Sequence, residues 1–97
     1  MSQMLRKYHL QEGKAEEWVK FWSEQLVPLR LKHGFEVIGG WVTEDEKNFY
    51  WIISHDGDFD KAEGEYHADR NGNVEIDRIP TMLVKGTSEH IRVNRVL

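Results

Sequence analysis

One stretch of the sequence constrains the fold more than any other: Pro28 to Trp41, Pro-Leu-Arg-Leu-Lys-His-Gly-Phe-Glu-Val-Ile-Gly-Gly-Trp. A proline removes a backbone donor and clashes with the preceding turn, so a helix that reaches Pro28 is expected to kink or restart there. Gly34 is a suitable residue to end that helix. Residues 35–43 are rich in β-branched and aromatic types and follow as a strand. The stretch therefore predicts the junction between a long helix and a strand.

The remaining segments complete a simple order of elements. The sequence predicts strands over 5–10, 48–55 and 87–96, a helix from Lys14 to Gly34 and a second helix over 60–68. Residues 73–86 carry no clear periodicity, and Pro80 argues against a central strand there. The order β-α-β-β-α-β is typical of the ferredoxin-like α+β fold, an antiparallel sheet with two helices on one face. We expect one domain over residues 1–97.

The second face of the predicted sheet lacks a cover. Residues 48–55, Asn-Phe-Tyr-Trp-Ile-Ile-Ser-His, are apolar on both faces of their strand, and the two helices can cover only one of them. Pairing the sheets of two copies face to face would bury the other, so we expect a homodimer. Gly39 and Gly40 weaken a strand interior, which predicts a bulge that bends the sheet.

Charge and composition exclude several classes of partner. The net charge is −4, and no cluster of lysine and arginine is present to neutralise phosphates, so nucleic-acid binding is not expected. No apolar run approaches the length of a membrane span, and the first residues lack the apolar core of a signal peptide, so a cytoplasmic protein is expected. The chain has no cysteine. Glu63 and His67 lie one helical turn apart without a second histidine, so a solvated helix face is favoured over a metal site.

A resemblance to a known family rests on the spacing Trp22, Pro28-Leu-Arg, His33-Gly-Phe and Gly39-Gly-Trp, followed by Phe49-Tyr-Trp-Ile-Ile and Phe59-Asp-Lys-Ala-Glu. Over roughly residues 4–70 the chain resembles the NIPSNAP family, which belongs to the dimeric α/β-barrel superfamily. The resemblance implies a homodimer whose two sheets enclose a barrel. It also implies relatives of several kinds: cofactor-independent monooxygenases, haem-degrading enzymes, small isomerases and cyclases. Fold membership does not choose among these reactions.

The candidate site combines polar and aromatic groups from neighbouring strands. His55 ends the most apolar strand, where partial burial would shift its pKa and leave it reachable. Arg6 and Tyr8 share one face of the first strand, and Trp41 and Tyr50 lie on adjacent strands. We expect catalytic roles for His55, Tyr50 and Arg6, and ligand contacts from Tyr8, Trp41 and Trp51. The alternative is that His55 bonds a loop backbone group and that the aromatic residues only pack the dimer.

Three hypotheses of function arise from these residues. The leading hypothesis is a small-molecule enzyme or binder that acts in the cavity on an aromatic or polyketide-like compound, with cofactor-independent monooxygenation as its reaction and no bound cofactor. The second hypothesis is a non-enzymatic homodimeric interaction protein. The third is a haem-binding protein with His55 or His9 as the axial ligand.

Overall fold

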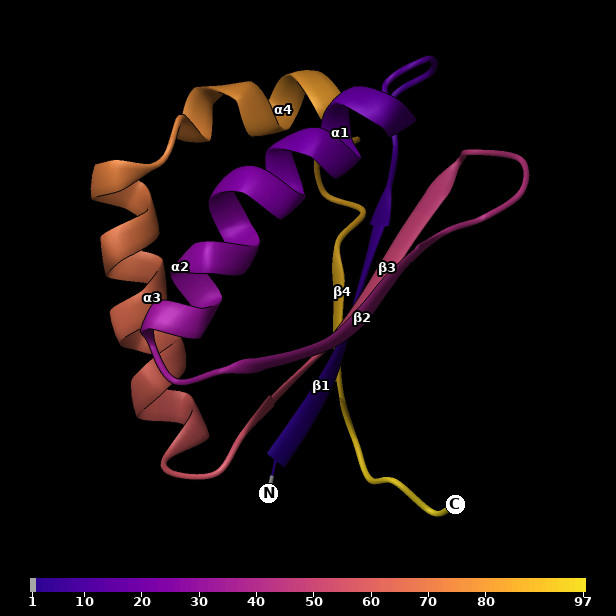
Figure 1. Cartoon of the computed structure of the whole chain (residues 1–97). Helices are drawn as coiled ribbons and strands as arrows, with labels where there is room; N and C mark the ends of the chain where they lie inside the picture. The colour runs from indigo at the N-terminus through magenta and orange to yellow at the C-terminus, as the bar shows by residue number, and fades with distance from the viewer. Residues whose placement is uncertain (1) are drawn as a thin grey trace.

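A four-stranded antiparallel sheet forms one layer of the protein, and the helices pack against one of its faces (Figure 1). The computed structural model describes residues 2–97. The strand order is β2-β3-β1-β4. The strands are β1 Ser2–His9, β2 Glu36–Val42, β3 Asn48–His55 and β4 Glu89–Val93. This arrangement confirms the predicted ferredoxin-like α+β fold. The last strand is shorter than predicted and lies at the edge of the sheet.

The predicted long helix has three parts. α1 spans Ala15–Phe21, a π-helical segment continues over Trp22–Leu26, and α2 spans Val27–Lys32. The amide of Val27 donates to the carbonyl of Trp22, five residues back, and Pro28 then lies in the first turn of α2. Proline is tolerated there because it has no N–H to satisfy. The predicted restart at Pro28 is confirmed, and Gly34 comes after the helix with a φ of 81°.

α3 spans Phe59–Asn73 and is longer than the predicted helix over 60–68. Its start is set by Asp58, whose side chain accepts a hydrogen bond from the amide of Lys61 at 3.1 Å. The turn signal at its end is overridden because the side-chain amide of Asn73 donates to the backbone carbonyl of Asp69 at 3.2 Å and to its carboxylate at 2.6 Å. The helix therefore continues through residues 69–73.

The segment without a sequence prediction closes one end of the helical layer. It forms a 3₁₀ turn over Ile76–Arg78 and the short helix α4 over Ile79–Met82. Backbone hydrogen bonds tie the end of α4 to the end of β1: Gln11 donates to Met82 and Val84 donates to His9, each at 2.8 Å. These bonds hold the residues after α4 beside the helix-covered face of the sheet.

The two faces of the sheet differ sharply. On the helix-covered face, Tyr8 lies opposite Phe49 and Arg6 opposite Trp51, and all four side chains are buried. On the second face, no helix covers the strands within residues 2–97 (Figure 1). There Trp41 lies opposite Tyr50, and Leu5 lies opposite both Ile52 and Ile91. Three apolar side chains of this open face are about half exposed: Ile38 at 47%, Trp41 at 51% and Ile91 at 46%.

The glycine pair in β2 lies where the strand pairing is irregular. The register between β2 and β3 shifts between Val37 and Gly39, which confirms the predicted bulge. Gly40 has a second role, because a Cβ added to it would lie 2.6 Å from the indole ring of Trp22. The absence of a side chain thus allows the π-helical segment to approach the sheet closely.

Within residues 2–97, none of the helices combines the length and the apolar character that crossing a membrane requires.

Candidate functional site

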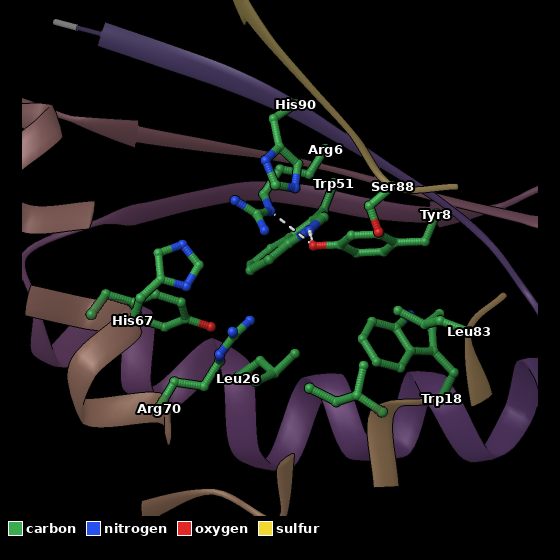
Figure 2. Close-up of a pocket in the computed structure, with 12 residues that line it drawn as sticks. Arg6, Tyr8, Trp18, Leu26, Trp51, His67, Arg70, Leu83, Ser88 and His90 are labelled. Atoms are coloured by element: carbon green, nitrogen blue, oxygen red, sulfur yellow. Dashed lines mark hydrogen bonds between the residues drawn. The ribbon is translucent and has the colours of Figure 1, made fainter. Parts of the chain in front are cut away.

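A cavity of about 200 Å³ lies between the helix-covered face of the sheet and the helices (Figure 2). Arg6, Tyr8 and Trp51 contribute from the sheet, and Trp18 and Leu26 contribute from α1 and the π-helical segment. The remaining wall comes from α3, from residues around α4 and from β4. It is formed by Tyr66, His67, Arg70, Ile79, Leu83, Ser88 and His90. The segment that the sequence left unassigned therefore supplies part of the wall.

On the sheet side of this cavity, two hydrogen bonds meet at the hydroxyl of Tyr8. It accepts hydrogen bonds from Arg6 Nε at 2.8 Å and from the indole Nε1 of Trp51 at 3.0 Å (Figure 2). Strand geometry explains the contact, because residues 6 and 8 share a face and Trp51 pairs directly with Arg6. Both partners are donors only, so the phenolic proton of Tyr8 is left to donate to a third group. The three side chains are each less than 7% exposed.

Behind the cavity, the carboxylate of Glu63 contacts two arginines and one histidine. Glu63 accepts from Arg30 Nη1 and Nη2 at 2.9 and 3.0 Å, and from Arg6 Nη1 at 3.4 Å. His67 Nε2 lies 2.5 Å from Glu63 Oε1. Burial alone would raise the pKa of Glu63, but the hydrogen bonds from His67 and Arg30 and the charges of Arg30 and Arg6 outweigh it. They hold the pKa of Glu63 well below its usual value, so this carboxylate is ionised at neutral pH.

Arg30 is fully buried and surrounded by aromatic rings. Its guanidinium carbon lies 3.6 Å from the centre of the Tyr66 ring, 4.7 Å from that of Phe35 and 5.3 Å from that of Trp51. Such rings stabilise a desolvated cation through their negative faces. Burial in turn raises the pKa of Tyr66. The arginine thus serves as a fixed part of the core that orients Glu63.

Two more groups on the cavity wall carry distinct chemistry. His90 pairs with Arg6 across β4 and β1, and its pKa is lowered by desolvation and by the charge of Arg6. Its imidazole is therefore neutral at physiological pH and available as a proton acceptor. Within residues 2–97, Arg70 has a buried Nε without a hydrogen-bond partner, and its Nη2 donates to Asn71 Oδ1 at 3.4 Å.

The structure brings together three of the six residues proposed from the sequence. Arg6, Tyr8 and Trp51 meet at the cavity, as described above. Tyr50 and Trp41 pair with each other as expected, but on the open face of the sheet. They lie across the sheet from the cavity, so their assignments to catalysis and ligand binding stay predictions that this cavity does not support.

His55 lies away from the cavity, and both its ring nitrogens contact the backbone. Its Nδ1 accepts a hydrogen bond from the amide of Gly57 at 2.9 Å, and its Nε2 lies 3.3 Å from the carbonyl oxygen of His33. Since Nδ1 is the acceptor, Nε2 carries the proton and donates to that carbonyl. His55 therefore ties the end of β3 to the end of α2, which is the structural alternative that the sequence left open.

Sequence reasoning missed the role of α3 in the cavity. It favoured a solvated face for Glu63 and His67, but the side chain of Glu63 is only 17% exposed and that of His67 32%. The signal was present, because Glu63 comes one turn after Phe59 and Arg30 one turn after Leu26 on apolar stripes. A charged residue on such a stripe needs a buried partner. Within the described chain, no group of three or more potential metal ligands occurs.

A family model and several solved structures indicate one family. The family model of NIPSNAP matches residues 3–82. Among curated proteins, none matches the chain. The protein Atu4242 of Agrobacterium tumefaciens, a NIPSNAP family protein of unknown function, superposes with a TM-score of 0.83 at 16% identity, covering 99% of this chain and 94% of that one. An uncharacterised NIPSNAP domain protein of Burkholderia xenovorans superposes with a TM-score of 0.78 at 17% identity, covering 99% and 95%.

A more distant structure extends the likeness of the fold. A putative antibiotic biosynthesis monooxygenase of Nitrosomonas europaea superposes with a TM-score of 0.75 at 8% identity, and both chains are covered completely, at 100% each. At this identity the likeness concerns the fold alone.

Proposed function

The chain belongs to the NIPSNAP family, and on that premise we propose that it is a small-molecule enzyme or binder whose ligand is an aromatic compound held in the cavity beside Tyr8. The observation that carries the proposal is the Tyr8 hydroxyl, which accepts from Arg6 and Trp51 and keeps its own proton free to donate. A hydroxyl polarised by two donors in a buried site is suited to hold an oxygen on which negative charge develops.

The shape and lining of the cavity favour an aromatic ring. Its walls are largely aromatic and apolar, with a few polar groups, as in ligand pockets generally. Its volume of about 200 Å³ exceeds the roughly 150 Å³ of an apolar cavity known to hold benzene. A single substituted ring fits this space, whereas a polycyclic polyketide would need the walls to move apart.

The reaction that we propose is cofactor-independent monooxygenation. An activated CH₂ group of the ligand becomes a carbonyl: R₂CH₂ + O₂ → R₂CO + H₂O, so one oxygen atom enters the product and the other leaves as water. His90, neutral at physiological pH, is the proposed base that removes the first proton. Tyr8, polarised by Arg6, donates to the resulting enolate or phenolate oxygen. The distant monooxygenase of the same fold supports this choice of reaction.

Intrinsic tryptophan fluorescence tests the binding step. Trp18 and Trp51 line the cavity, so a phenol or a methylphenol that enters it should change their emission. Tyr8→Phe should weaken this binding by roughly two- to tenfold, because a hydrogen bond between two neutral groups contributes about 0.5–1.5 kcal/mol. Tyr50→Phe is the matched control on the open face and should leave binding unchanged. If Tyr50→Phe weakens binding and Tyr8→Phe does not, the ligand binds on the open face and the proposed site is wrong.

Oxygen uptake tests the reaction. With a bound one-ring substrate that carries an activated CH₂ or phenolic ring, the protein should consume O₂ without added metal or flavin. His90→Ala should reduce the rate while the dissociation constant changes little, since His90 acts on a proton and not on the bound ring. Binding without oxygen uptake would support a binding protein and would rule out the proposed monooxygenase reaction.

A second candidate function rests on the open face of the sheet. Ile38, Trp41 and Ile91 are about half exposed there, around the half-buried Leu5 and Ile52. An apolar face of this kind suits pairing with the same face of a second copy, so the proposed alternative is a homodimeric interaction protein. The third hypothesis, haem binding, gains no support from the cavity, because His9 and His55 do not line it.

A further inference from the structure

Two arginines give the lining of the cavity a positive charge. Arg6 and Arg70 both line it, whereas Asp and Glu are absent from its lining within residues 2–97. The carboxylate of Glu63, which contacts Arg6 from behind the wall, is already bound to both terminal nitrogens of Arg30. Arg6 and Arg70 together therefore bring more positive charge to this site than Glu63, shared with Arg30, can balance. A partly buried charge without a counter-charge is unfavourable, so a site of this kind favours an anion.

The buried hydrogen-bonding groups of the cavity that lack a partner within residues 2–97 are donors. Arg70 Nε is buried without a partner in the described chain, and so is the indole Nε1 of Trp18. The hydroxyl of Tyr8 accepts from two groups and has its own proton left to give. Figure 2 shows Arg70 reaching up from α3 toward the same space that Tyr8 and Trp18 border. Donors without acceptors select a ligand that carries acceptors, and a carboxylate, with four lone-pair positions, supplies the most in the smallest volume.

We propose that the ligand is a one-ring aromatic carboxylate, and that Arg70 recognises its carboxylate. This inference rests on the proposed function and narrows it to one class of compound. A guanidinium matches a carboxylate through two parallel N–H bonds, and arginine is preferred over lysine where such planar recognition occurs. The ring then lies among the aromatic and aliphatic walls formed by Trp18, Trp51 and Leu26.

A matched pair of ligands isolates the charge. 4-Hydroxybenzoate and 4-hydroxybenzamide have nearly the same shape and the same phenol, and they differ in the carboxylate. By fluorescence titration, 4-hydroxybenzoate should bind about 10- to 100-fold more tightly, which is the range for a hydrogen bond to a charged group. Arg70→Gln should reduce this preference to less than about threefold, and Arg70→Lys should retain part of it.

Lys61→Gln is the control, since it removes a positive charge from the exposed side of the same helix. It should leave the preference intact, and circular dichroism of each variant should show the native helix content. Equal binding of the two ligands to the unchanged protein would overturn the carboxylate inference while the proposed function stands. Binding of neither ligand, nor of phenol, would overturn both. A preference that survives in Arg70→Gln would show that Arg70 is not the recognising group.

Discussion

Arg30 binds Glu63 through both of its terminal nitrogens, at 2.9 and 3.0 Å, and thereby joins α2 to α3 beneath the sheet. The arginine is fully buried, so its charge depends entirely on this carboxylate and on the rings around it. Desolvating two charges is costly, and such a pair is a weak source of net stability. Its clearer consequence is geometric: Glu63, fixed in this way, positions Arg6 and His67 at the cavity.

Removing one partner of this pair should destabilise the protein strongly. Glu63→Gln leaves the buried guanidinium of Arg30 without its counter-charge, and breaking a buried pair in this way costs about 3–5 kcal/mol. Urea denaturation monitored by circular dichroism measures the free energy of unfolding. Glu65→Gln is the control, because Glu65 is exposed on the same helix, and its effect should stay within about 0.5 kcal/mol.

The paired replacement of both residues separates charge from packing. Arg30→Met combined with Glu63→Met should be less destabilising than the sum of the single variants, since no lone charge remains in the core. Additive effects would show that Arg30 and Glu63 do not act as a pair.

Acid should destabilise the protein through Glu63. Its pKa in the folded state lies below the ordinary value of 4.5, so the unfolded state binds a proton first as the pH falls. The stabilisation is fully present above about pH 4.5 and is lost progressively below it. The free energy of unfolding of the natural protein, measured between pH 7 and 3, should decrease as the pH falls below about 4.5. The fall should be shallower in Glu63→Gln, and an unchanged slope in this variant would assign the acid sensitivity to other carboxylates.

Two glycines should respond to alanine in opposite directions. A methyl group at Gly40 would lie 2.6 Å from the ring of Trp22, so Gly40→Ala forces the packed indole to shift. Overpacking of this kind costs about 1–3 kcal/mol. Gly64 lies within α3 with open space around the position of a Cβ, so Gly64→Ala should stabilise by about 0.5–1 kcal/mol. Thermal unfolding of the two variants beside the natural protein compares them directly.

The fold could be predicted because its signals are local. Pro28, Gly34 and the apolar strand over residues 48–55 act through their own backbone and neighbours, and the elements formed where they were expected. The end of α3 could not be predicted. Asn73 is typical of a turn, but here its side chain donates to Asp69 one helical turn earlier, and the helix continues to residue 73. The short helix α4 depends on backbone bonds to the end of β1, which the sequence order does not reveal.

The candidate site could be predicted only in part, because it combines one face of the sheet with side chains from several helical segments. Period-two counting placed Arg6 and Tyr8 together, and pairing with β3 added Trp51. The same counting could not choose which face the helices cover, so Tyr50 and Trp41 were grouped with residues from the opposite face. Arg70 reaches the cavity, and Glu63 lies behind it, because of how α3 packs against the sheet, which no local pattern encodes.

The open face should decide the assembly of the protein. Trp41 is 51% exposed, so Trp41→Ala should change the stability of an isolated chain by only about 1 kcal/mol. In the proposed homodimer the same ring lies between two sheets, and its loss should weaken association by tenfold or more, as for aromatic residues at the centre of an interface. Sedimentation over a range of concentrations measures this shift. Leu31→Ala is the control, because Leu31 is 56% exposed on α2, on the helical side of the sheet. Equal effects of the two substitutions, or a natural protein that stays monomeric at micromolar concentration, would contradict pairing through the sheet.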